Sequence, residues 1–279
     1  MKTLVQKVVV EEHHSFACRT YRTPDFETNW HMHEETELIL ITEGQGTVMI
    51  GDYVGPYKPG DVFFIASYLP HWFRKDQPNM IGSVIAAQFK PSILGDAFLQ
   101  NPEMRLINKL LKKKDGLMLK QKLSADTAKL LREMEEAKGF KRIAQLLNAL
   151  QTISISKQTQ VLTQNFTDTG KSDPAIERII DYSFQHYLEP ITLQEIADEV
   201  AMTIPTFCRF FKKNIKKTYF EFLQELRINH ACNLLKNTNK PILTICYESG
   251  YNSWAHFSQK FKMIKQVSPN QYRKEFKDS

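Results

Sequence analysis

The chain is poor in the features that mark secreted, disulfide-stabilised and membrane-spanning proteins. It has four cysteines in 279 residues, Cys18, Cys208, Cys232 and Cys246, and no two of them form a CxxC pair. Scattered cysteines of this kind indicate small buried or half-buried residues rather than a zinc or disulfide framework. Residues 1–14 lack the apolar run of a signal peptide, and no segment approaches the roughly 18 uninterrupted apolar residues of a membrane helix. We therefore expect a cytoplasmic, reduced protein with no membrane partner.

Positive charge is concentrated near the C-terminal end of the chain. The net charge is +6 overall, but residues 204–277 hold 14 Lys and Arg against 4 Asp and Glu, so this stretch alone carries +10. A basic block of this kind suits a phosphate backbone. A merely solvated basic surface would carry the same charge, so the interpretation depends on the pattern inside the block.

The basic block ends in a helix–turn–helix pattern over residues 241–264. Gly250 can end a first helix, since glycine accepts the left-handed conformation found at helix ends. Ser253 can cap a second helix that carries Phe257 and Phe261 on its buried side. A polar, basic second helix braced on a first is how a helix–turn–helix presents side chains to a major groove.

The same pattern occurs earlier, over residues 192–214. Thr192 and Glu195 form a capping box that opens its first helix. A second capping box, Thr218 with Glu221, opens a longer helix between the two copies. The copies correspond at a constant offset of 50 residues, which matches Thr203, Phe207, Phe211 and Lys212 with Ser253, Phe257, Phe261 and Lys262.

At these residues the chain resembles the AraC/XylS family of bacterial transcription regulators. The family pattern is IADEVAMTIPTFCRFFKK in the first unit and ICYESGYNSWAHFSQKFKMIKQVSPNQYR in the second, and the resemblance covers residues 174–277. It implies an all-α DNA-binding domain of two helix–turn–helix units joined by a linker helix. It also implies binding to promoter DNA, a role as activator, contact with RNA polymerase and a small-molecule effector. The chain departs from the usual family glycines at Ala201, Lys216 and Gln266, and from a frequent arginine at Gln259.

Nine residues are candidate DNA contacts because they lie outside the predicted helix cores or cap the recognition helices. Arginine can pair with guanine and glutamine with adenine, whereas lysine binds phosphate. Caps with neighbouring N–H groups can also hold a phosphate. The candidates are Thr203, Thr206, Arg209 and Lys212 in the first unit, and Ser253, Trp254, His256, Gln259 and Lys262 in the second.

The N-terminal third reads as short strands separated by glycine and proline turns, which favours a small barrel or sandwich. Within it, the spacing of two histidines, a glutamate and a third histidine resembles a cupin barrel. Three imidazoles and a carboxylate suit a divalent metal. The resemblance to AraC/XylS regulators instead implies that the barrel binds an organic effector. If it does, no cofactor is expected. The candidate metal ligands are His31, His33, Glu37 and His71, and the candidate effector contacts are these four with Trp30 and Trp72. The β-rich runs are 4–10, 15–21, 37–42, 46–50, 61–65 and 81–89.

The middle of the chain turns helical and then polar. We expect one helix over 97–113, a second capped by Ser124, and a third with an apolar stripe formed by Phe140, Ile143, Leu146, Leu147 and Leu150. The resemblance implies that helices of this segment pair two subunits into a homodimer. The predicted domains are a cupin-like effector-binding barrel (1–95), a helical dimerisation segment (96–157), a linker (158–172) and a DNA-binding domain (173–279).

Three functions are open at this point. The leading prediction is a sequence-specific, effector-controlled transcription regulator that is not an enzyme, and the family resemblance implies a sugar as its effector. The second is a metal-dependent cupin enzyme or metal sensor attached to a DNA-binding domain, with the histidine cluster as its centre. No further acid–base group accompanies that cluster in the sequence. The third is a constitutive DNA-binding protein whose barrel only dimerises.

Overall fold

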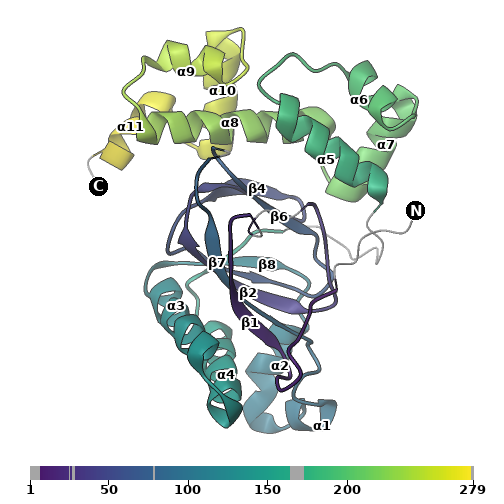
Figure 1. Ribbon diagram of the computed structural model, residues 1–279. Helices are drawn as coiled ribbons and strands as arrows, with labels where there is room; N and C mark the ends of the chain where they lie inside the picture. The colour runs from purple at the N-terminus through teal and green to yellow at the C-terminus, as the bar shows by residue number, and fades with distance from the viewer. Residues whose placement is uncertain (1–6, 25, 27–28, 78, 164–172, 278–279) are drawn as a thin grey trace. The chain divides into compact units, whose positions relative to one another are not determined.

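The computed structural model describes residues 7–24, 26, 29–77, 79–163 and 173–277, and it divides into two compact units between Pro174 and Ala175 (Figure 1). The first unit is rich in strands, and the second consists of helices. This arrangement confirms the predicted fold class, a sheet-rich domain followed by an all-α domain. None of the helices in the described residues is long and apolar enough to cross a membrane.

The strands of the first unit form two antiparallel sheets. One has six strands in the order β1-β7-β2-β5-β8-β9, and the other has three in the order β4-β3-β6. In the part of the chain that is described, no hydrogen-bonded ladder links one sheet to the other. The bounds are β1 Ala17–Arg22, β2 Thr36–Glu43, β3 Gly46–Ile50, β4 Tyr53–Tyr57, β5 Val62–Ile65, β6 His71–Lys75, β7 Ser83–Phe89, β8 Gly116–Leu119 and β9 Thr159–Val161.

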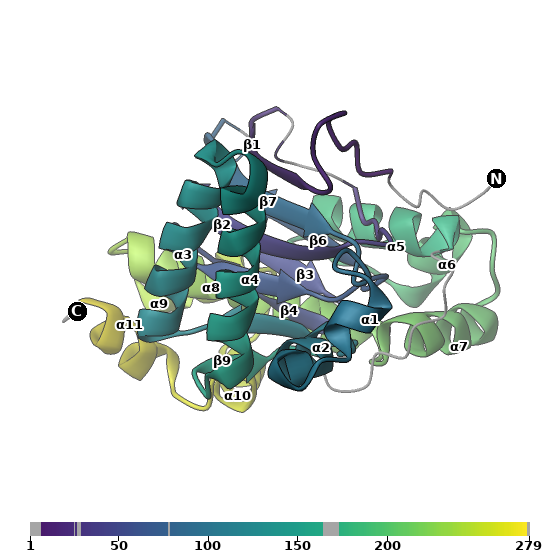
Figure 2. The same cartoon turned by 90° about the horizontal axis from the view of Figure 1, so that it is seen from below.

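Helices α3 and α4 lie side by side against the six-stranded sheet (Figure 2). Leu146 and Leu150 of α4 are buried in the core that α4 shares with α3 and the sheet. Phe140, at the start of the predicted apolar stripe, is 81% exposed, so only part of the stripe packs against the chain's own core. The helical segments of this unit are α1 Asp96–Leu99, η1 Pro102–Met104, α2 Arg105–Leu111, α3 Gln121–Glu136 and α4 Gly139–Ile155.

Strand β1 shows how the sheet separates two environments. Successive side chains of a strand point to opposite faces. Thr20 donates its hydroxyl to Glu135 of α3 at 2.7 Å, so the face of Cys18 and Thr20 meets the helices. Arg19 and Tyr21 point to the other face, where they line a cavity. We call this second face the inner face of the sheet.

Two helix predictions in the first unit need correction. The single helix expected over 97–113 is split into α1, η1 and α2, because Pro102 has no N–H to continue the first helix. Ser124 does not cap α3 but lies inside it, where its hydroxyl donates to the carbonyl of Gly60 at 2.9 Å.

The strand predictions also differ from the structure in detail. Strands β4 and β6 were not predicted; β4 carries Gly55 and Pro56, which read as a turn. Strands β8 and β9 fall in segments predicted as helical and as linker, so the sheet extends to Val161. Residues 7–10 of the strand expected over 4–10 form no strand, and residues 4–6 and 164–172 lie outside the described part.

The second unit consists of α5 to α11. Both predicted capping boxes are present: the hydroxyls of Thr192 and Thr218 accept from the backbone N–H groups of Glu195 and Glu221, whose carboxylates accept in return. These boxes open α6 and the long helix α8. The bounds are α5 Pro174–His186, α6 Leu193–Glu199, α7 Ile204–Ile215, α8 Tyr219–Asn237, α9 Ile242–Glu248, α10 Trp254–Lys265 and α11 Pro269–Lys277.

Candidate functional site

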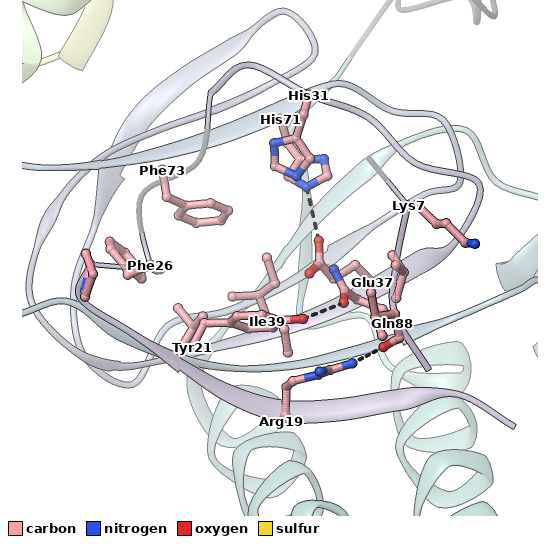
Figure 3. Close-up of a pocket in the computed structure, with 15 residues that line it drawn as sticks. Lys7, Arg19, Tyr21, Phe26, His31, Glu37, Ile39, His71, Phe73 and Gln88 are labelled. Atoms are coloured by element: carbon pink, nitrogen blue, oxygen red, sulfur yellow. Dashed lines mark hydrogen bonds and ion pairs between the residues drawn. The ribbon is translucent and has the colours of Figure 1, made fainter. Parts of the chain in front are cut away.

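A cavity of about 490 Å³ lies on the inner face of the six-stranded sheet (Figure 3). Strands β1, β2 and β7 supply one wall, and β6 of the three-stranded sheet supplies another. Its described lining residues are Lys7, Val8, Val9, Arg19, Tyr21, Pro24, Phe26, His31, Glu37, Ile39, His71, Phe73, Val84, Ala86 and Gln88. The cavity therefore combines aromatic and aliphatic surface with a small number of polar groups, which is typical of a ligand site.

Three imidazoles converge at one side of this cavity. A nitrogen of each of His31, His33 and His71 lies within 4.8 Å of the others, and all three residues are buried. Each Nδ1 donates to a backbone carbonyl, at 2.8 Å to Asn29, 3.0 Å to Glu35 and 2.8 Å to Leu69, respectively. A carbonyl can only accept, so every Nδ1 carries the proton and every Nε2 is the basic nitrogen of the neutral ring.

Glu37 closes the cluster. Its Oε2 lies 3.3 Å from Nε2 of His33 and 3.1 Å from Nε2 of His71. Burial alone would raise the pKa of Glu37, but hydrogen bonds to these two imidazoles outweigh it and lower the pKa. For His33 burial acts to lower the pKa, and the bonds and charges of Glu37 and Glu35 outweigh it and raise the pKa. His31 differs, because burial and the neighbouring imidazoles lower its pKa to about 3 and keep it neutral.

These contacts require a positive charge between Glu37 and the rings. A carboxylate oxygen and an unprotonated Nε2 both present lone pairs, so each short contact between them needs a proton or a metal ion. A divalent ion bound by imidazole nitrogens and a carboxylate would satisfy the same geometry, and backbone carbonyls that orient ligating histidines through Nδ1 are common in metal sites. The residues present thus fit a metal, and they equally fit the hydroxyl groups of an organic ligand.

The structure brings together only part of the predicted effector site. His31, Glu37 and His71 line the cavity, and His33 contacts Glu37 beside it. Trp30 and Trp72 are buried, and neither is among the described lining residues.

The aromatic rings that do line the cavity are Tyr21, Phe26 and Phe73. Of these, sequence reasoning missed Tyr21 and Phe26. Period-two alternation in β6 separates Phe73 from Trp72: since His71 faces the cavity, Phe73 must share its face and Trp72 must point away. Trp72 instead lies under the guanidinium of Arg74, 5.6 Å from its ring centre.

The two helix–turn–helix units of the second domain are built alike. Phe207 and Phe211 of α7, and Phe257 and Phe261 of α10, are all fully buried. Both helices end in a residue with left-handed backbone, Lys216 with φ 62° and Gln266 with φ 62°. All nine candidate DNA contacts are exposed on or beside α7 and α10.

One of the predicted caps is absent. Ser253 accepts from the N–H of His256 at 3.5 Å, as expected. Thr203 makes no capping bond to the backbone of α7, and its hydroxyl donates to the hydroxyl of Thr206 at 3.0 Å. Pro205 lies at the second position of α7, where proline supplies no N–H.

Comparison with known proteins assigns both units. Residues 13–84 match the family model described as AraC-like ligand binding domain, and residues 196–275 match a Helix-turn-helix domain. The chain belongs to the AraC family. It is 24% identical over 87% of its length to the HTH-type transcriptional activator RhaS of Mannheimia succiniciproducens, of which it covers 88%. It is also 24% identical to the activator RhaR of that organism, with 88% of this chain and 87% of that protein aligned.

A third relative is the melibiose operon regulatory protein of Escherichia coli, 25% identical over 45% of this chain and 43% of that protein. These relatives are regulators of transcription, and the two family models describe ligand binding and DNA binding rather than catalysis. As an AraC-family protein, the chain is thus a DNA-binding transcription regulator with a ligand-binding domain. The cavity lies in the unit that holds the ligand-binding match, and the exposed helices α7 and α10 lie in the unit that holds the DNA-binding match.

Proposed function

We propose that this AraC-family regulator is an activator controlled by a small organic effector, a sugar or sugar derivative, bound in the cavity of the first unit. The observation that carries the proposal is a cavity of about 490 Å³ that joins aromatic rings to the buried cluster of His31, Glu37 and His71. Rings stack on sugar faces, and imidazole and carboxylate groups bond sugar hydroxyls. Two of the relatives reported above are named activators, and a third is named for a melibiose operon.

The DNA contacts follow from the exposure of the recognition helices. We propose that Arg209 and Gln259 read bases, whereas Lys212 and Lys262 bind phosphates. Thr203, Thr206, Ser253, Trp254 and His256 complete the proposed contact set. Because the target is promoter DNA, we propose that the protein acts in the cytoplasm and contacts RNA polymerase there.

The effector function is tested by replacing His33 and Glu37 together with alanine in the full-length protein. DNA affinity, measured by fluorescence anisotropy on a promoter fragment, should be unchanged without effector. The effector response, measured as transcription from that promoter with a panel of sugars, should be lost. A double variant that responds like the parent protein would remove both the organic-effector and the metal interpretations of this cavity.

A second candidate function, a response to metal, is favoured by one observation. All three imidazoles are oriented through Nδ1 so that their basic nitrogens meet at one point beside Glu37. His31, His33, His71 and Glu37 would then hold a zinc, iron, manganese or nickel ion that supplies a Lewis-acidic site for a ligand. Elemental analysis of protein purified without added metal decides: near one equivalent, lost on His31→Ala, would favour the metal function.

We further propose that two copies pair through α4. Its outward side carries Phe140 and Ile155, which are 81% and 60% exposed, with the half-buried Ile143 and Leu147 between them. An exposed apolar stripe of this length is typical of a protein–protein interface. Phe140→Asp should convert a dimer into a monomer in light scattering, while Lys141→Asp, beside it on the exposed surface, should not. Dimers of equal strength in both variants would place the interface elsewhere.

A further inference from the structure

We propose that the effector carries an acidic group, a carboxylate or a phosphate, and that Arg19 binds this group. The inference rests on the proposed effector function of the cavity and adds the chemical class of its ligand. Among the described residues that line the cavity, Lys7 and Arg19 are cations and Glu37 is the single carboxylate. Positive charge thus exceeds negative charge around the cavity.

Glu37 does not balance the charge of Arg19. Its carboxylate is only 4% exposed and is held by His33 at 3.3 Å and His71 at 3.1 Å. Its negative charge is therefore committed to the imidazoles at one side of the cavity. A ligand hydroxyl can still bond Glu37 and the imidazoles, but Glu37 does not neutralise the charge of Arg19.

Arg19 forms no ion pair with a carboxylate among the described residues. It donates to the carbonyl of Val9, and its guanidinium lies 5.8 Å from the centre of the Tyr21 ring (Figure 3). A guanidinium has five N–H donors in a planar fork that matches the two oxygens of a carboxylate or phosphate. One backbone carbonyl leaves most of these donors for a ligand.

The sheet leaves room for a ligand between the two polar ends of the cavity. Arg19 of β1 stands opposite Ala86 of β7, and Ala86 stands opposite Ile39 of β2. The small side chain of Ala86 opens space beside Arg19 on the inner face. Burial raises the pKa of Tyr21, while the charge of Arg19 lowers it and that of Glu37 raises it, so this phenol is within reach of both charges.

A sugar acid or sugar phosphate matches these groups better than a neutral sugar. Its hydroxyls can bond the side of the cavity formed by His31, His71 and Glu37, and its ring can pack on Tyr21 or Phe73. Its acidic group can form charge-assisted, bidentate hydrogen bonds with Arg19, which are stronger than bonds between neutral partners. A neutral sugar would bury the guanidinium of Arg19 without giving it a negatively charged partner.

The test compares neutral sugars with their acidic counterparts on the full-length protein in chelator. Isothermal titration is run with hexoses and pentoses, with the uronic and aldonic acids made from them, and with their phosphate esters. We expect an acidic member to bind at least about tenfold more tightly than its neutral parent. Uronates and phosphate esters separate the two kinds of acidic group.

Variants of β1 show whether Arg19 is responsible. Arg19→Gln should weaken the acidic ligand about tenfold or more and leave its neutral parent unchanged, and Arg19→Lys should lie between. Arg22→Gln is the matched control, because Arg22 is on the same strand but pairs with Glu43 at 3.0 Å outside the cavity. Melting temperatures without ligand confirm that each variant is folded.

The titrations distinguish a failure of the inference from a failure of the effector function. Equal affinity for neutral and acidic members, or acidic binding that Arg19→Gln does not weaken, would overturn the inference while the effector function stands. If no member of any class binds, the sugar-effector function and the inference fall together.

Discussion

At the scale of single residues, the C-termini of α7 and α10 carry a conformation that their residues disfavour. Lys216 and Gln266 each have φ 62°, and Ala201, which follows α6, has φ 53°. The left-handed region costs a residue with a Cβ about 1–2 kcal/mol. Glycine avoids this cost, and related regulators were expected to carry glycine at these three positions. The sequence therefore indicated correctly where the backbone would turn, even though the usual residue is missing.

Lys216→Gly and Gln266→Gly should each stabilise the protein by about 1 kcal/mol. Glycine removes the strain of the left-handed conformation. Part of this gain is offset because glycine has more conformational freedom in the unfolded chain. Lys213→Gly is the control, since it makes the same exchange inside α7 and should cost about 1 kcal/mol. Urea unfolding measures all three, and a loss of stability at both Lys216 and Gln266 would contradict the strain argument.

His31 makes stability depend on pH in a defined direction. Its pKa is lowered from 6.5 to about 3, first by burial and then by the neighbouring His71 and His33. Between these two values the unfolded chain binds a proton that the folded chain does not. The free energy of unfolding should therefore decrease as the pH is lowered from about 6.5 towards about 3, by up to about 1.4 kcal/mol per pH unit from this one group. His33 acts with the opposite sign, because its raised pKa adds stability that is lost as the pH rises through the folded value.

His31→Gln should remove this acid sensitivity. The difference in unfolding free energy between the variant and the parent should grow in favour of the variant as the pH falls from about 7.5 to about 5. Urea unfolding in the presence of chelator measures it without competition from a bound metal. Parallel pH curves for the two proteins would show that His31 is not held neutral in the folded state.

At the scale of elements, two threonines of the second unit precede helices in the sequence, but only one of them makes a side-chain capping bond. The hydroxyl of Thr218 accepts from the N–H of Glu221 in a complete capping box, whereas the side chain of Thr203 makes no hydrogen bond to the backbone of its helix. Thr218→Ala should cost about 1 kcal/mol, and Thr203→Ala should cost little. Thermal unfolding of the two variants gives the comparison, and equal losses would mean that the hydroxyl of Thr203 stabilises the helix in another way.

The cavity shows why the site could be predicted only in part. Motif spacing selected His31, His33, Glu37 and His71, since these positions are close in the chain or match a known motif. Arg19 and Tyr21 of β1 and Phe73 of β6 also line the cavity, and which residues of these strands do so depends on which strand face turns inward. That choice is fixed by register: β6 pairs Trp72 with Met49 and Phe73 with Val48, and strand propensity alone does not give such pairs. Helix boundaries failed for a local reason, the missing N–H of Pro102.

At the scale of the whole molecule, DNA recognition is divided between base reading and phosphate binding. Arg209→Ala and Gln259→Ala should each relax base preference, at a cost of roughly 1–3 kcal/mol on the best site. Lys262→Ala should instead weaken binding to all sequences similarly and reduce its salt dependence. Anisotropy titrations on matched and single-mismatch duplexes at two salt concentrations give both quantities. Equal losses on every duplex for all three variants would show that Arg209 and Gln259 bind phosphate.

Strand β1 places the cavity and the helical layer one residue apart. Arg19 faces the cavity, while the next residue, Thr20, is bonded to Glu135 of α3, and the carbonyl of Cys18 accepts from Arg142 of α4 at 3.2 Å. If a ligand bound to Arg19 shifts β1, it shifts the same strand that contacts α3 and α4. Thermodynamic linkage then makes the coupling reciprocal: if α4 pairs two subunits, pairing must tighten ligand binding by the same factor by which the ligand tightens pairing. The affinity for effector would in that case rise with protein concentration, so the cell's supply of the regulator would set its sensitivity.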